Sequence, residues 1–167
     1  APTGGNQSSR RWLVIRDPET KKEIADLYRE VGGKFLKEQS ELLDGTGHHN
    51  EKTIKASSYL AEHLEEIPVI VLVTIYGQHD GSGRPGLFDS VIQAAWSFCL
   101  ALHSRGLGSA WTTMHLGNAS KIAELLDMPE GVTQVVLLPV AHTIGDKFSP
   151  VPRDPAREIT WFEKWGK

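Results

Sequence analysis

The chain is poor in cysteine: Cys99 is the only one among 167 residues, so no disulfide can form within the chain. A reducing compartment is the default for such a sequence, and we expect a cytoplasmic protein. Cys99 stands in the apolar run 94–102, where a small buried residue is a better interpretation than a nucleophile.

Long apolar runs and an excess of charge are missing too. No apolar run approaches the ~18 residues that a membrane helix needs, so no membrane partner is expected. The formal net charge of -3 gives no electrostatic reason to bind nucleic acid. The length suits one domain over 1–167, and the composition is that of an ordinary globular protein.

Signatures of metal and nucleophile chemistry are also absent from the sequence. His48, His49 and Glu51 lie in a polar stretch, as do His79 and Asp80, but neither group has further ligands at zinc-site spacing. No G-x-S-x-G elbow surrounds a serine, and no pair of carboxylates is marked as acid and base. We therefore predict no metal and no catalytic side chain. An enzyme of this kind would depend on a cofactor for its chemistry.

A glycine-rich segment at 81–86 (GSGRPG) fits the G-x-G-x-x-G dinucleotide fingerprint. Three observations weaken that interpretation. The preceding strand should end near Tyr76, too early for the tight turn that the fingerprint needs, and no acidic residue follows about 20 positions on. Pro85 removes an N–H group that a phosphate would use. A mobile loop is the better interpretation.

Hydrophobic patterning predicts alternating strands and helices, which is typical of an α/β or α+β domain. Asp17 should cap a helix that starts at Pro18, Gly32–Gly33 should break it, and Gly106 should stop a later one. The helix over 91–102 is apolar on nearly every side, so it should run through the middle of the fold. Strands are expected at 12–15, 68–76, 107–114 and 133–143, and helices at 18–31, 35–43, 54–64, 91–102 and after Asn118.

The C-terminal tail is rich in aromatic residues. Trp161, Phe162 and Trp165 would each gain on the order of 2 kcal/mol by burial. They should therefore dock either on their own domain or on a second subunit.

Several segments together resemble the nitroreductase family in order and spacing. Ala1–Gln7 (APTGGNQ), before the strand at 12–15, is similar to the family's A-P-S-x-x-N-x-Q segment. The helix over 94–102 and the following 106–111 (GLGSAW) resemble its central helix and next strand. The C-terminal third resembles the family at 125–131, 135–140, 145–146 and 152–153. The residues at 94–96 and 111–114 are similar to those of an actinobacterial branch of the family. The chain starts after the position of the family's arginine-bearing N-terminal helix, so we expect an N-terminally abbreviated member.

The resemblance implies an α+β fold with a mixed central sheet flanked by helices, and a C-terminal tail that reaches the partner subunit of a homodimer. It implies flavin mononucleotide (FMN) at the subunit interface, and an oxidoreductase that takes hydride from NAD(P)H. A nitroaromatic, quinone or similar small acceptor would then take the electrons in the second step of a ping-pong cycle. The cofactor-binding residues implied in this way are Pro2, Thr3, Gly4, Asn6, Trp111, Thr112, Thr113, Met114 and Arg153.

Alternatives remain open for these assignments. Thr3 and Asn6 also suit a capped turn before a strand, and Arg153 also suits a solvated tail. The same fold could support another flavin reaction, or a flavin-binding domain without activity.

Overall fold

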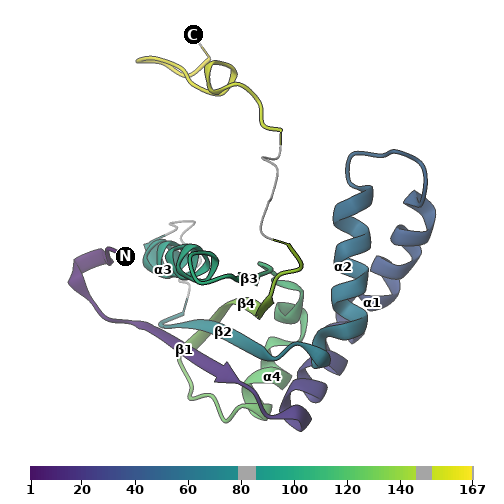
Figure 1. Ribbon diagram of the computed structural model, residues 1–167. Helices are drawn as coiled ribbons and strands as arrows, with labels where there is room; N and C mark the ends of the chain where they lie inside the picture. Colours follow the sequence, from purple (N-terminus) through teal and green to yellow (C-terminus); the bar gives the residue numbers. More distant parts are fainter. Residues whose placement is uncertain (79–85, 146–151, 167) are drawn as a thin grey trace.

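The computed structural model describes residues 1–78, 86–145 and 152–166. The glycine-rich motif at 81–86 therefore lies, apart from its last residue, outside the described residues. The described part contains one sheet whose strands lie in the order β1 (Arg10–Ile15), β2 (Val69–Tyr76), β4 (Val132–His142) and β3 (Leu107–Ser109) (Figure 1).

Every pairing between these strands is antiparallel, so the expected mixed sheet is not found among them. The connections explain the difference. A hairpin of two helices, α1 (Pro18–Leu43) and α2 (Glu51–His63), returns the chain to the same end of the sheet, so β2 runs opposite to β1. The single helix α3 (Gly86–His103) then joins β2 to β3, but β4 lies between those two strands. Separate helices around an antiparallel sheet confirm the α+β class.

Two hydrophobic clusters lie on the two faces of the sheet. Ile70 and Leu72 of β2 pack with α1 residues in one cluster, and Val71 and Val73 pack with α3 residues such as Val91 in the other. β2 is thus buried on both faces, as its unbroken apolar sequence predicted. A short helix, α4 (Ala119–Leu125), contributes Ile122 to the first cluster.

Helix α1 begins as predicted but does not break at Gly32–Gly33. Asp17 caps it, because its Oδ2 accepts from the backbone N–H of Thr20 at 2.8 Å, and this hydrogen bond lowers the pKa of Asp17. Gly32 is buried inside the helix, where a Cβ atom would lie 2.6 Å from Sδ of Met114. The glycine therefore permits close packing rather than a turn.

A hydrogen-bonded turn closes the tip of the α1–α2 hairpin. Glu51 accepts from the backbone N–H groups of Gly45 at 3.0 Å and Gly47 at 2.9 Å. Lys55 donates to Glu51 at 2.9 Å and also pairs with Asp44. These contacts, with Lys55 first, lower the pKa of Glu51 to about 2.

Helix α3 covers one face of the sheet instead of running through the middle of the fold (Figure 1). Its inner side is buried, whereas Ile92, Trp96 and Leu100, spaced four residues apart, stay about half exposed. Gly106 follows the helix with φ +72°, consistent with the predicted stop. No helix among the described residues is long and apolar enough to cross a membrane.

The strand expected over 107–114 is split into β3 and a separate bridge between Thr112 and Leu137. Both pairings keep one register, which places Ala110 opposite Pro139 of β4. Proline has no N–H to donate, so the ladder is interrupted there. Asn118 precedes α4 as predicted but does not cap it, since its side chain donates instead to the Leu27 carbonyl at 2.7 Å.

The tail over 152–166 extends away from the rest of the chain (Figure 1). Its short helical turn is η4 (Ala156–Glu158). Trp161 and Trp165 stack on each other with ring centroids 4.2 Å apart, yet Phe162 and Trp165 are 80% and 85% exposed. Docking on the same domain, one of the two expectations for this tail, is therefore not observed.

Candidate functional site

The opening turn, which holds Pro2, Thr3, Gly4 and Asn6, packs against the N-terminal half of α3. The backbone N–H of Gly4 donates to Oγ of Ser90 at 2.8 Å. Gly4–Asn6 form a 3-10 turn, η1, in which Asn6 has φ 55°. Asparagine tolerates this left-handed conformation better than most side chains, which accounts for its place in the turn.

The polar side chains of this turn are not used by the turn itself. Thr3 stands at the N-cap position but makes no capping hydrogen bond, and the turn is closed by backbone bonds such as Asn6 N–H to the Thr3 carbonyl at 3.1 Å. Across the described parts of the chain, the side chains of Thr3 and Asn6 have no hydrogen-bond partner. They remain available to a ligand.

The segment from Trp111 to Met114 lies at the edge of the sheet, beyond β3. Thr112 exchanges two backbone hydrogen bonds with Leu137, of 3.1 and 2.9 Å. Its side-chain hydroxyl lies 2.7 Å from the hydroxyl of Tyr28 on α1. Burial raises the pKa of Tyr28, and the hydrogen bond to Thr112 partly opposes that change. Thr112 is thereby fixed from two sides.

The pairing of Thr112 determines the direction of its neighbours' N–H groups. In an antiparallel ladder, residues on either side of a hydrogen-bonded pair point their N–H groups away from the partner strand. The N–H groups of Trp111 and Thr113 therefore face outward from the sheet edge, and no backbone acceptor for them is found in 1–78, 86–145 or 152–166. The N–H of Thr112, in contrast, is already used. Two outward donors on a fixed edge fit the polar rim of a planar ring such as a flavin.

Met114 and His115 link this segment to α1. The Sδ atom of Met114 occupies the space that Gly32 leaves open. His115 is fully buried, and neither ring nitrogen has a hydrogen-bond partner among the residues described. Burial lowers its pKa to about 4, so it is neutral near pH 7. Sequence reasoning missed His115, because a single histidine between Met114 and Leu116 carries no pattern that predicts burial of its ring.

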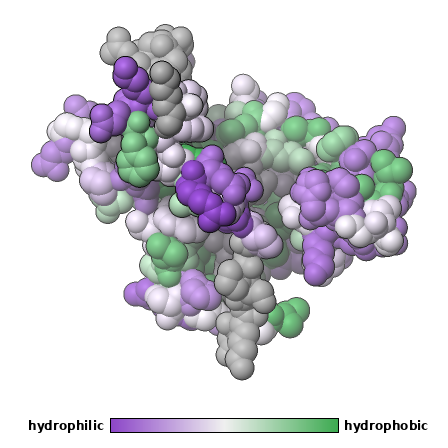
Figure 2. Space-filling model, turned by 90° about the horizontal axis from the view of Figure 1, so that it is seen from above, coloured by the Kyte–Doolittle hydropathy of each residue, from purple (hydrophilic) through white to green (hydrophobic). Residues whose placement is uncertain are grey.

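A hollow of about 860 Å³ adjoins this segment and separates it from α2. Leu60, Ile67 and Ala110 also line a second hollow of about 430 Å³ that continues toward the end of α3. Figure 2 shows hydrophobic surface in green between the lobe of the helical hairpin, at the right, and the centre of the molecule. The larger hollow is lined by Tyr28, Lys52, Thr53, Ala56, Ser57, Tyr59, Leu60, His63, Ile67, Ala110, Trp111 and Thr112.

Arg153 lies in the extended tail, away from the opening turn and from the segment of Trp111 to Met114. The one hydrogen bond that it is seen to donate goes to the neighbouring Pro152 carbonyl at 3.0 Å, so its guanidinium is exposed and open to an anion. Within one chain, the structure thus brings Trp111 and Thr112 to the hollow, but it places the opening turn on α3 and Arg153 in the tail, which extends away from the sheet (Figure 1). No group of side chains that could hold a metal ion occurs among residues 1–78, 86–145 and 152–166.

Among curated proteins, the chain is similar to an iodotyrosine deiodinase from Nematostella vectensis. It is 26% identical over 170 aligned residues, which cover 95% of this chain and 61% of the relative. The chain therefore spans less than two thirds of the length of that protein.

Solved structures share the fold. An oxidized iodotyrosine deiodinase bound to FMN and 3-iodo-L-tyrosine superposes with a TM-score of 0.67 at 21% identity, covering 100% of this chain and 81% of that one. An NADPH:FMN oxidoreductase from Vibrio harveyi complexed with NAD+ gives 0.69 at 17% identity, covering 100% and 64%. A BluB-like flavoprotein from Clostridium difficile 630 gives 0.63 at 20%, covering 98% and 84%.

The family model described as "Nitroreductase family" matches residues 1–144, which include the opening turn, the sheet and the segment beside the hollow. Because this match takes in most of the chain, and the superpositions extend over all of its described elements, the chain belongs to the nitroreductase family.

Proposed function

We propose that the chain binds FMN and acts as an FMN-dependent oxidoreductase. The observation that carries this proposal is the pair of outward N–H groups at Trp111 and Thr113, held at a sheet edge beside a largely apolar hollow. This edge can donate to the polar rim of a flavin ring and leave one face of the ring open to the hollow. A deiodinase of the same fold bound to FMN, and an NADPH:FMN oxidoreductase of that fold, support the choice of cofactor.

Six of the predicted residues then have a defined part. Trp111 and Thr113 donate backbone hydrogen bonds to the ring, and Thr112, whose own N–H is used, fixes their direction. Thr3 and Asn6 offer unused polar side chains to the ribityl chain, and Arg153 offers a planar cation to the phosphate. When bound, FMN would supply two-electron chemistry between NAD(P)H and a quinone, nitroaromatic or similar acceptor. The protein contributes position and electrostatics.

A homodimer would explain why the opening turn, the segment of Trp111 to Met114 and the tail lie apart within one chain, because a second copy could supply some of them to each site. Trp96 and its neighbours on α3 form an apolar stripe, and Trp12 and Val14 of β1 are exposed on the same side. Trp12 touches this helix, its ring centroid 5.2 Å from that of Phe98. Burying the stripe against a second copy would bring one opening turn near the other chain's site, and the aromatic tail would pack on the partner.

The proposal is tested by titrating the purified protein with FMN while flavin fluorescence is measured. We expect quenching that saturates, and then rapid bleaching of the bound flavin on stopped-flow mixing with NADH or NADPH. A protein that stays colourless and quenches no flavin fluorescence would rule the proposal out. A flavin-loaded dimer that turns over no acceptor would favour a binding domain without activity.

A second candidate function is reductive removal of halogen from an aromatic ring. The relative from Nematostella vectensis, called an iodotyrosine deiodinase, supports it. The reduced, flavin-loaded protein should be mixed anaerobically with a halogenated phenol and, separately, with a quinone. Release of halide ion would favour dehalogenation, whereas oxidation by the quinone alone would favour the first candidate.

A further inference from the structure

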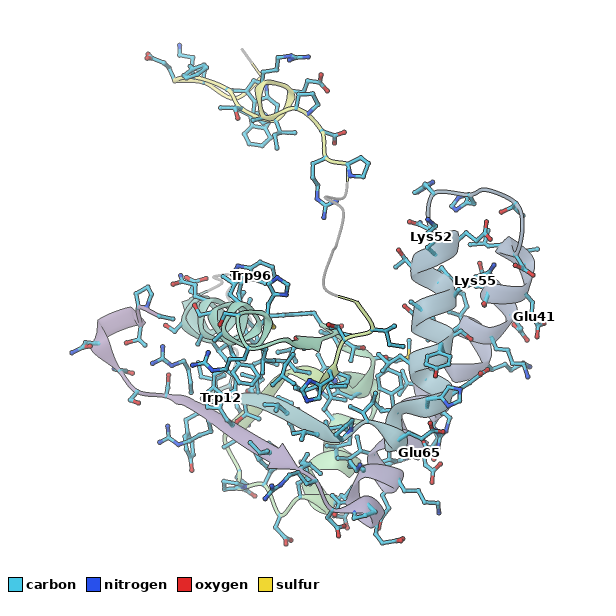
Figure 3. The ribbon with its side chains drawn as sticks, in the orientation of Figure 1. Trp12, Glu41, Lys52, Lys55, Glu65 and Trp96 are labelled. Carbon is cyan, nitrogen blue, oxygen red and sulfur yellow. The ribbon has the colours of Figure 1, made fainter. Side chains whose placement is uncertain are left out.

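We propose that the larger hollow selects aromatic acceptors that carry an anionic group, with Lys52 as the residue that recognises the anion. This inference rests on the proposed function, because it assigns the acceptor side of the same site. Lys52 lies near the tip end of α2 (Figure 3), and the same hollow reaches Trp111 and Thr112 at its other side. A ligand that spans the hollow would touch both the cation and the segment where we place the flavin.

The charge around the hollow has one sign. Of the residues that line it within the described ranges, Lys52 carries a permanent charge, and none is a carboxylate. The other polar groups of the lining are hydroxyls and the ring of His63. An anion beside the exposed Lys52 would meet no carboxylate in this lining, whereas an aromatic cation would be repelled by Lys52 with no nearby anion to offset the repulsion.

Lys52 differs from its neighbour Lys55 in having no ion partner among the described residues. Lys55 is held by Asp44 and Glu51, which raise its pKa, and it closes the turn at the tip of the hairpin. No salt bridge to Lys52 is found in the parts of the chain that the structure covers. Its ammonium group is available to a ligand.

The walls of the hollow suit a flat ring. Tyr59 and His63, one turn apart on α2, stack with ring centroids 4.2 Å apart. His63 is oriented by Glu66, whose Oε1 lies 2.9 Å from Nδ1 of His63. Trp111 contributes a third ring from the sheet edge. Aromatic walls on two elements, with a cation near one end, match an aromatic carboxylate better than an aliphatic acid.

The experiment measures binding directly by calorimetry, with 4-nitrobenzoate as the anionic probe and 4-nitrobenzamide as its neutral counterpart. We expect the flavin-loaded protein to bind the carboxylate about fivefold more tightly than the amide, the upper value for an ion pair with an exposed lysine. The variant Lys52→Met should lose most of that preference while its affinity for the amide stays within about twofold. Lys22→Met, which removes an exposed lysine of α1 outside the hollow, is the matched control and should behave as the unchanged protein.

The outcomes separate this inference from the proposed function. Equal affinity for the two probes, or an unchanged preference in Lys52→Met, overturns the inference even when FMN binds normally. Failure to bind FMN would contradict the proposed function. The same calorimetry on the flavin-free protein would then test the preference for the carboxylate over the amide by itself. Tyr59→Leu should weaken both probes alike, because it removes an aromatic wall and no charge; an effect on the carboxylate alone would contradict the assigned roles.

Discussion

His115 shows at the scale of one residue what burial does without a partner. Its two ring nitrogens are enclosed and unbonded within the described structure, next to the segment that we place beside the flavin. Such a group is costly, because a buried polar atom loses its hydrogen bonds to water and gains none. The cost increases when the ring must also accept a proton.

The free energy of unfolding should therefore depend on pH through His115. Its pKa is about 4 in the folded chain and 6.5 ordinarily, so between these values the unfolded chain binds more protons. Stability is fully present above pH 6.5 and should fall by up to about 3 kcal/mol as pH drops toward 4. Urea unfolding at several pH values measures this slope. His115→Leu should flatten it, whereas the exposed His49→Gln should not; equal slopes in all three proteins would contradict the prediction.

Gly32 and Gly33 provide a matched pair of substitutions. Alanine is favoured over glycine inside a helix by about 1 kcal/mol at either position. At Gly32, however, the new Cβ would lie 2.6 Å from Sδ of Met114, whereas at Gly33 the nearest atom is Cβ of Arg29 at 3.2 Å. We expect Gly32→Ala to be less stable than Gly33→Ala by no more than about 1 kcal/mol, because the contacted atoms are the flexible end of the Met114 side chain. It should also weaken FMN binding, because Met114 must move. Thermal melts and FMN titrations of both variants test this, and identical behaviour would refute it.

At the scale of elements, the sequence predicted every strand and the starts of α1 and α4, because these depend on local pattern, whereas α2 and α3 begin earlier than expected. Asp17 caps α1 and β2 is buried on both faces, as the residues themselves indicate. What could not be predicted depends on contacts distant in sequence. Gly32 does not end a helix, since Met114 needs its space, and Pro139 splits the strand over 107–114 from the neighbouring strand.

The outer face of α3 carries a prediction at this scale. Its sequence is apolar all round, which suggested a central helix, yet Trp96 is 59% exposed in the single chain (Figure 3). If this face is the dimer interface, Trp96→Glu should place a charge within it and shift the protein toward monomers. Sedimentation velocity measures the change. Leu42→Glu, at an exposed leucine of α1, is the control and should leave the oligomeric state unaltered. A monomeric unchanged protein, or a dimeric Trp96→Glu, would contradict the assignment.

For the whole molecule, the resemblance identified the family and predicted the segments of the site, but these segments do not meet within a single chain. Asn6 lies on the turn beside α3, and Arg153 lies in a tail that extends away from the sheet (Figure 1). Local sequence carries no information on which chain supplies which residue. Only the separation in space indicates that a site using both residues is shared between subunits.

Mixed dimers test that sharing. Asn6→Ala and Arg153→Ala should each reduce FMN retention in their own homodimers, because each removes a polar contact from both equivalent sites. If the two residues reach one flavin from different chains, a mixed dimer holds one doubly altered site and one intact site. Coexpression with two affinity tags isolates it, and we expect about half of the unaltered FMN content. If both residues came from the same chain, every site would carry one substitution, and the mixed dimer would retain no more FMN than its parents.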